Sequence, residues 1–135
     1  MPIAPKLNWT SHKLRWSNCK QCELCKTRSN VVLARGDIPC DVIFIGEAPG
    51  PSEDTIGSPF MGAAGKLLDQ IIENAEYSSY TVKKSFTNLI SCIPVGIQPG
   101  VFVNPDELYL KSCKPRLQEF VELAKPKGIV MAGKL

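Results

Sequence analysis

The chain is organised around the stretch DVIFIGEAPGPSEDTIGSPFMGAAGKLLD, residues 41–69. Residues 42–45 are β-branched or aromatic, which is typical of a strand buried on both faces. The strand breaks at Gly46 into a loop that carries five glycines and three prolines up to Gly65. Open parallel sheets bind ligands at the carboxyl ends of their strands, and glycines let the backbone approach a ligand closely. The loop is therefore predicted to form the active site.

This loop does not match the common phosphate-binding patterns. No G-x-G-x-x-G occurs, and the sequence around Lys66 lacks both the Ser/Thr and the upstream glycine of a P-loop. A nucleotide-hydrolysing function is therefore disfavoured.

Periodic patterns follow the loop. Residues 66–76 predict an amphipathic helix, residues 84–90 a second strand and residues 128–132 a third. Helix signals also appear at residues 104–107, with Asn104 as the expected N-cap, and Pro115 is expected to kink or restart that helix. Its part from residue 116 to residue 124 precedes the third strand. Residues 30–33 suggest a short strand that ends at Arg35-Gly36. This order predicts a three-layer α/β/α fold with a short parallel sheet.

Length and composition indicate one globular domain of 135 residues, with 44% hydrophobic and 21% charged residues. There is neither an 18-residue apolar run nor the apolar core of a signal peptide, so we expect a cytoplasmic protein without membrane contact. Residues 1–36 carry seven Lys/Arg against one acid. We divide the chain into a basic leader, residues 1–18, and a domain, residues 19–135. The leader is either a phosphate-contacting surface or a merely solvated segment.

Six cysteines in a chain without a secretory signal favour metal or redox chemistry over disulfides. Cys19, Cys22 and Cys25 form two overlapping C-x-x-C pairs, the short-range half of many four-thiolate sites. Spacing alone leaves iron-sulfur and zinc equally acceptable, because both metals accept tetrahedral sulfur.

The string GEAPGPSEDTIGSPFMGAAGKLLD, residues 46–69, resembles the first motif of the family 4 uracil-DNA glycosylases, the iron-sulfur branch of the uracil-DNA glycosylase superfamily. The resemblance extends over residues 19–135. It implies a DNA-repair enzyme that flips uracil out of DNA and hydrolyses its N-glycosidic bond. The alternative is a noncatalytic module, stapled by a metal, that binds nucleic acid through the basic leader.

The resemblance also implies a uracil pocket. Phe60 corresponds to the family's stacking phenylalanine and Asn88 to the asparagine that pairs with the uracil edge. Glu47 corresponds to the motif carboxylate, which can orient water and stabilise the sugar cation. Glu47 and Asn88 are thus the expected catalytic residues. The backbone of three neighbouring residues, Ala48, Pro49 and Gly50, is expected to line the same pocket.

In that family a 4Fe-4S cluster is held by four cysteines. The matching positions are Cys19, Cys22, Cys92 and Cys113. Cys25 and Cys40 are then expected to be small buried residues. Zinc remains the alternative metal.

The sequence departs from the family at two places. Family members continue with a helix and a strand that bears a His-Pro motif, whose histidine bonds the leaving uracil; the only histidine here is His12. Residues 92–95 read Cys-Ile-Pro-Val where the family commonly has Cys-Arg-Pro-Pro. We therefore expect a domain that is incomplete at its C-terminus and excises uracil very slowly or not at all. We also expect a monomer if the domain is complete, and self-association through the exposed edge of the 128–132 strand otherwise.

Overall fold

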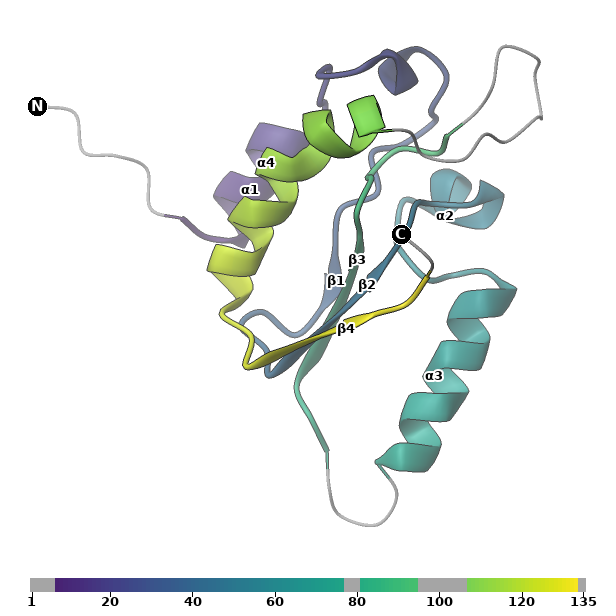
Figure 1. Cartoon of the computed structure of the whole chain (residues 1–135), viewed down its shortest axis with the longest axis vertical. Coiled ribbons are helices and arrows are strands. Elements are labelled where there is room, and N and C mark those ends of the chain that lie inside the picture. Colours follow the sequence, from purple (N-terminus) through teal and green to yellow (C-terminus); the bar gives the residue numbers. More distant parts are fainter. Residues whose placement is uncertain (1–6, 77–80, 95–106, 134–135) are drawn as a thin grey trace, which may run out of the picture.

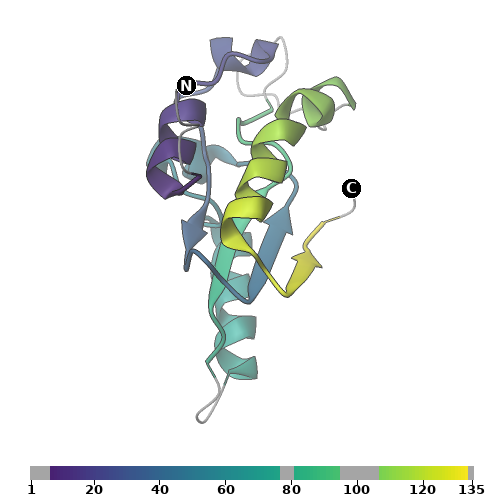
Figure 2. The same ribbon diagram turned by 90° about the vertical axis from the view of Figure 1, so that its left-hand side faces the viewer.

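The computed structural model describes residues 7–76, 81–94 and 107–133. A four-stranded sheet lies between two helical layers, with α3 on one face and α1 and α4 on the other (Figures 1 and 2). The predicted three-layer α/β/α fold is therefore confirmed. In chain order the elements are α1 (Trp9–Trp16), the 3-10 turn η1 (Glu23–Lys26), β1 (Arg35–Gly36), β2 (Val42–Gly46), α2 (Pro51–Ile56), α3 (Ala63–Ala75), β3 (Lys84–Asn88), α4 (Glu107–Ala124) and β4 (Gly128–Met131).

The strand order in the sheet is β1-β3-β2-β4, and β2 pairs in parallel with both β3 and β4. The parallel prediction holds for these three strands. It is wrong for β1, which pairs antiparallel with β3 and makes the sheet mixed. The short strand also lies at residues 35–36 instead of 30–33. The shift follows from Gly36, whose φ of 109° and close fit against the Lys84 carbonyl suit no other residue.

Two short helices were not predicted from the sequence. Helix α2 forms inside the glycine-rich loop, where Pro51 occupies its first turn and the Glu53 carboxylate accepts the N–H of Gly50 at 2.9 Å. The Glu53 contact is the half of a capping box in which the N3 side chain binds the N-cap N–H, and proline is favoured in the first turn. Helix α1 begins after Asn8, whose side chain accepts the N–H of Ser11. Both helices span at most two turns, so their apolar periodicity is too brief to detect.

Helix α4 runs without a break through Pro115, so the predicted restart does not occur. The expected N-cap, Asn104, lies outside the described residues. A proline removes one backbone hydrogen bond within the helix. The loss is tolerated where the helix is clamped by packing: Phe120 and Ala124 are fully buried, and α1 lies against α4.

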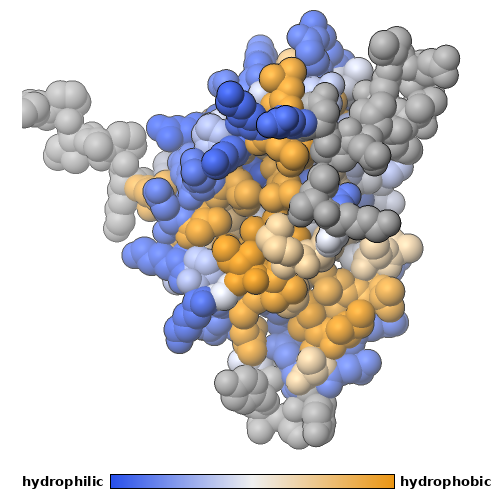
Figure 3. Space-filling model, viewed as in Figure 1, coloured by the Kyte–Doolittle hydropathy of each residue, from blue (hydrophilic) through white to orange (hydrophobic). Residues whose placement is uncertain are grey.

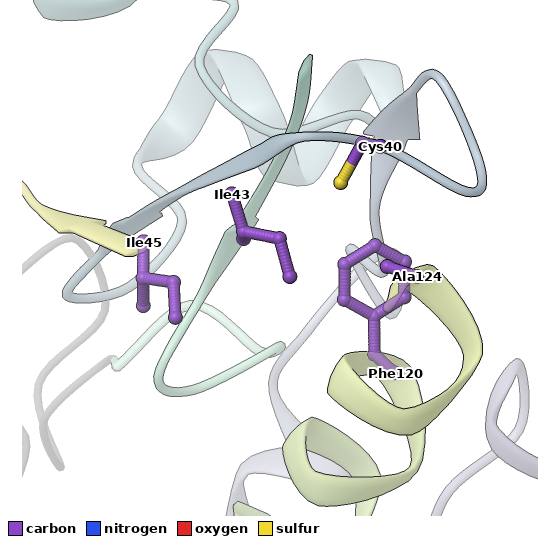
Figure 4. Packing of buried hydrophobic residues seen from close by; sticks show 5 residues of the cluster. All are labelled: Cys40, Ile43, Ile45, Phe120 and Ala124. Carbon is purple, nitrogen blue, oxygen red and sulfur yellow. The ribbon is translucent and has the colours of Figure 1, made fainter. Parts of the chain in front are cut away.

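The core lies between the sheet and α4. Ile43 and Ile45, alternate residues of β2, point from the sheet toward Phe120 of α4, with Cys40 beside them (Figure 4). Cys40 is buried, and its Sγ lies 3.2 Å from Ser85 Oγ, so it is a packed residue as expected. No helix in the described ranges is both long and apolar enough to cross a bilayer.

The opposite side of the sheet is less covered. Apolar side chains gather over β4 and the neighbouring part of α3 (Figure 3). All four residues of β4 are exposed, with Ile129, Val130 and Met131 each close to half exposed. Leu67 and Ile71 of α3 are exposed as well.

Candidate active site

A pocket of about 570 Å³ opens where β2 and β3 end and α3 begins. Four of the predicted residues line it: Glu47, Ala48, Phe60 and Asn88. Pro49 and Gly50 are not among the lining residues, and Pro49 is buried beside them. The pocket thus lies at the carboxyl ends of parallel strands, the place that the sequence predicts.

Gly46 brings Asn88 and Phe60 together. It is the register partner of Asn88 in the parallel β2–β3 pair. A Cβ atom at position 46 would lie 2.5 Å from Asn88 Oδ1 and 2.8 Å from Phe60 Cζ. Both side chains therefore occupy the space that any other residue would need. Asn88 is 4% exposed, and no hydrogen bond within the described residues engages its amide. The amide is available to a ligand.

Phe60 is held in an unusual backbone conformation. Its φ is 56°, in the left-handed region that β-carbon-bearing residues rarely adopt. Arg35 secures the turn by donating from Nε to the Pro59 carbonyl (2.7 Å) and from Nη2 to the Phe60 carbonyl (3.2 Å). The arginine also lies over the Phe86 ring, 4.1 Å from its centroid. Backbone strain that its surroundings hold in place is typical of a ligand-contacting residue.

Two acids fix the loop itself. The Glu53 carboxylate accepts the N–H groups of Gly50, Met61 and Gly62, and so joins the start of α2 to the loop before α3. Asp54, nearly buried, accepts the N–H groups of Ser29 and Asn30 through Oδ1. Both carboxylates are occupied by the backbone, so they shape the pocket.

Glu47 follows β2 directly and is partly exposed at the pocket. Its carbonyl accepts the N–H of Ile90 at 3.1 Å. A Cβ at Gly133, just past β4, would lie 2.6 Å from Glu47 Cγ and 2.9 Å from Oε1. The carboxylate therefore lies beside the exit of β4, at the edge of the pocket opposite α3.

The four predicted cysteines Cys19, Cys22, Cys92 and Cys113 line one small cavity of about 20 Å³, whereas Cys25 and Cys40 do not. Two of the sulfurs receive hydrogen bonds at 3.4 Å: Arg28 Nη1 donates to Cys92 Sγ, and the Ser91 N–H donates to Cys113 Sγ. Burial raises the pKa of the Cys92 thiol to about 11, against the lowering effect of Arg28. Burial also raises the pKa of the Cys22 thiol.

Within the described ranges, no group of three or more His, Cys, Asp or Glu side chains is arranged to hold a metal ion. Four thiols at one cavity are a donor set that suits either a tetrahedral zinc ion or an iron-sulfur cluster.

His12 lies away from the pocket. It is fully buried in α1, where its ring contacts Trp9 and Phe120, and neither ring nitrogen has a hydrogen-bond partner among the described residues. Burial lowers the pKa of His12 to about 4. Its environment is that of a packed core residue.

The other departure from the family is at residues 92–95, and its last residue, Val95, lies outside the described residues.

The sequence did not reveal Arg116, a buried arginine of α4. Its guanidinium donates to Thr87 Oγ1 and to the carbonyls of Asn88 and Leu89. This contact explains why β3 ends in polar residues that are buried. The sequence does contain one indication of this burial. Arg116 lies four residues before Phe120, and so on the apolar face of the helix, where a charged residue is unexpected.

Comparison with known proteins gives one family. The family model described as the uracil DNA glycosylase superfamily matches residues 33–135. A type-4 uracil-DNA glycosylase of Sulfurisphaera tokodaii is 37% identical over 118 residues, which cover 87% of this chain and 50% of that protein. Those of Saccharolobus solfataricus (37% identical, 86% and 51% covered) and Archaeoglobus fulgidus (34%, 87% and 55%) are similar. The chain thus spans about half the length of these relatives.

Proposed function

Because this chain belongs to the uracil-DNA glycosylase superfamily, we propose that it recognises uracil in DNA and hydrolyses the bond between the base and its sugar. The three relatives are named type-4 uracil-DNA glycosylases, which supports that subclass for this chain. The observation that carries the proposal is the meeting of Asn88 and Phe60 over Gly46 at the end of β2.

Recognition follows from the chemistry of these two side chains. The Asn88 amide can donate to uracil O4 and accept from N3–H, whereas cytosine presents the opposite pattern at these positions. Phe60 offers a ring face, and base–aromatic stacking contributes about 1–3 kcal/mol. An amide and a ring at one narrow pocket suit a flipped base, which must be read on its edge and held by its face.

Glu47 supplies the charge for the hydrolytic step. Cleavage of the bond leaves a sugar with oxocarbenium character, which a carboxylate stabilises and to which it can direct a water molecule. The position of Glu47 in the pocket lining, next to Gly133, supports this role. In this scheme Asn88 selects the base, and Glu47 acts on the sugar.

We also assign a 4Fe-4S cluster to Cys19, Cys22, Cys92 and Cys113. The support is the shared cavity and the two N–H donors to sulfur, together with the type-4 name of the relatives. When bound, the cluster supplies covalent ties between the segment before η1, the end of β3 and α4. Zinc is the alternative, and metal analysis decides between them. We further place the protein in the cytoplasm, with uracil-containing DNA as its partner.

The test compares the wild type with Asn88→Asp on single-stranded and duplex oligonucleotides that carry one uracil. An ionised carboxylate only accepts hydrogen bonds, so it repels O4, and excision is expected to fall at least about tenfold. Asn74→Asp, at an exposed amide of α3 outside the pocket lining, is the control for the same chemical change. Unchanged excision by Asn88→Asp would refute the base-reading role. Tight binding of uracil DNA without excision by the wild type would favour the noncatalytic module.

A further inference from the structure

One buried guanidinium connects the candidate pocket to the cysteine cavity. Arg116 is 2% exposed. Its Nη2 donates to the carbonyls of Asn88 at 2.6 Å and Leu89 at 3.1 Å, and its Nη1 donates to Thr87 Oγ1 at 3.0 Å. One side chain therefore holds three consecutive residues at the end of β3, and the middle one is the residue that faces the pocket.

The same side chain lines the cysteine cavity. Arg116 follows Cys113 by one turn of α4, so both lie on the same side of the helix. The segment that continues from Leu89 reaches the cavity as well, because the Ser91 N–H donates to Cys113 Sγ and Cys92 is itself a lining residue. The end of β3 is thus anchored by Arg116 on one side and by the cysteines on the other.

The positive charge of Arg116 has no group of opposite charge beside it among the described residues. Within the described ranges it forms no ion pair with a carboxylate, and its buried Nε has no hydrogen-bond partner. A buried charge without a counter-charge is costly. Cysteines that bind a metal do so as thiolates, and these would place negative charge in the cavity that Arg116 lines. Loading of the site therefore stabilises the guanidinium where it holds Asn88.

We infer that Arg116 is a positioning residue, through which occupancy of the cysteine site fixes the orientation of Asn88 in the pocket. The inference rests on the proposed function, because it concerns the same amide and the same metal site. Its specific consequence is that a loss of metal weakens recognition of uracil, and that this effect requires Arg116.

The experiment measures the preference for uracil over cytosine in binding, because the Asn88 amide distinguishes these two bases. The probe is a fluorescent single-stranded oligonucleotide with one 2′-fluoro-2′-deoxyuridine, which resists hydrolysis, and the comparison oligonucleotide carries 2′-fluoro-2′-deoxycytidine. Wild type and Arg116→Gln are each assayed as purified without air and after removal of iron by chelation. Iron per chain and circular dichroism report loading and folding. Lys127→Gln, at a side chain 86% exposed, is the control.

We expect Arg116→Gln to retain its iron and to lose about tenfold of the uracil preference, since it removes hydrogen bonds from a charged donor. Chelation should weaken the preference of the wild type and have little further effect on Arg116→Gln, a non-additive result. Arg116→Lys keeps the positive charge but lacks the several fixed N–H donors of the guanidinium. It should therefore show a uracil preference between those of Arg116→Gln and the wild type.

An iron-loaded Arg116→Gln protein with the wild-type preference would overturn the inference, and so would equal effects of chelation in the two proteins. If Arg116→Gln does not fold, Arg116→Lys decides alone: a loss of preference supports the coupling and an unchanged preference overturns it. A wild type that neither prefers uracil nor excises it would instead refute the proposed function. The two failures are therefore distinguishable.

Discussion

At the scale of single residues, Gly46 is the position on which the pocket depends. A methyl group there would lie within 2.8 Å of both Asn88 Oδ1 and Phe60 Cζ. Gly46→Ala is therefore expected to displace the amide and the ring, and to lower kcat/KM for uracil excision at least about tenfold, because small misplacements of positioning groups have large effects on rate. Excision from a single-stranded oligonucleotide is the measurement.

Gly128→Ala is the matched control. Gly128 also belongs to a strand, and a Cβ there meets no heavy atom within 4 Å. Its rate and melting temperature should stay close to those of the wild type. Equal activity of the two variants would show that the base does not bind over Gly46.

The residues of the pocket differ in how far the sequence reveals them. The resemblance named Glu47, Phe60 and Asn88, and all three line one pocket; what they do there stays a prediction. Arg35 and Arg116 escaped notice, because an arginine in a sequence is by default an exposed residue. Only the three-dimensional contacts show that one holds the Phe60 turn and the other the Asn88 strand end.

At the scale of elements, the segment around η1 offers a matched pair of cysteines. Cys22 lines the cavity and Cys25, one turn later, does not. Cys22→Ser should abolish the brown colour and visible iron-sulfur absorbance of protein purified without air, and should lower its stability, because the metal joins segments that are distant in the sequence. Cys25→Ser should keep its colour.

Spectra and metal content of both variants are the measurements. Stoichiometric zinc without iron in the wild-type protein would contradict the cluster assignment. Loss of colour in Cys25→Ser alone would transfer the ligand role to that cysteine.

Length and periodicity explain which elements the sequence predicts. Strand β2 and helix α3 have long, regular apolar patterns, and both were predicted. Helix α2 spans six residues and β1 two, too few for a period to register. Their presence depends on contacts across the fold, such as Glu53 with Gly62 for the loop after α2 and Gly36 with Ser85 for β1.

At the scale of the whole molecule, His12 links stability to pH. Its pKa in the folded protein is lowered from 6.5 to about 4 by burial. Between these pH values the unfolded chain binds a proton at His12 and the folded protein does not. The free energy of unfolding is therefore at its full value above pH 6.5 and decreases as the pH falls toward 4. The expected loss between pH 7 and pH 5 is about 2 kcal/mol. Urea unfolding at both pH values measures it.

His12→Leu is the control for this effect. The ring nitrogens have no hydrogen-bond partners among the described residues, and the Glu119 carboxylate 3.9 Å from Nδ1 keeps Trp16 and Arg15 as donors, so an apolar side chain is tolerated. The variant should unfold at the same urea concentration at pH 7 and pH 5. An unchanged pH dependence would assign the acid sensitivity to other groups.

The exposed apolar surface over β4 and α3 predicts association of the 135-residue chain. Strand β4 pairs with β2 along one edge, and no strand pairs with its other edge among the described residues. Val130, 45% exposed, lies in the middle of this surface. Val130→Lys places a charge on it and should reduce concentration-dependent association, as charges on edge strands do. Sedimentation over a range of concentrations measures the effect, with Lys127→Gln as the control; a wild type that stays monomeric throughout would contradict the prediction.

The cysteine cavity can be completed only late in the synthesis of the chain, because its cysteines lie far apart in the sequence. Its lining comes from the segment before η1 and from α4, and Cys113 is translated about 90 residues after Cys22. At about 5–20 residues per second, the first pair of thiols waits on the order of 5–20 seconds for the last. Throughout this interval the nascent chain exposes reduced cysteines without their partners. Assembly of the proposed cluster therefore requires that those thiols stay reduced until translation has passed α4.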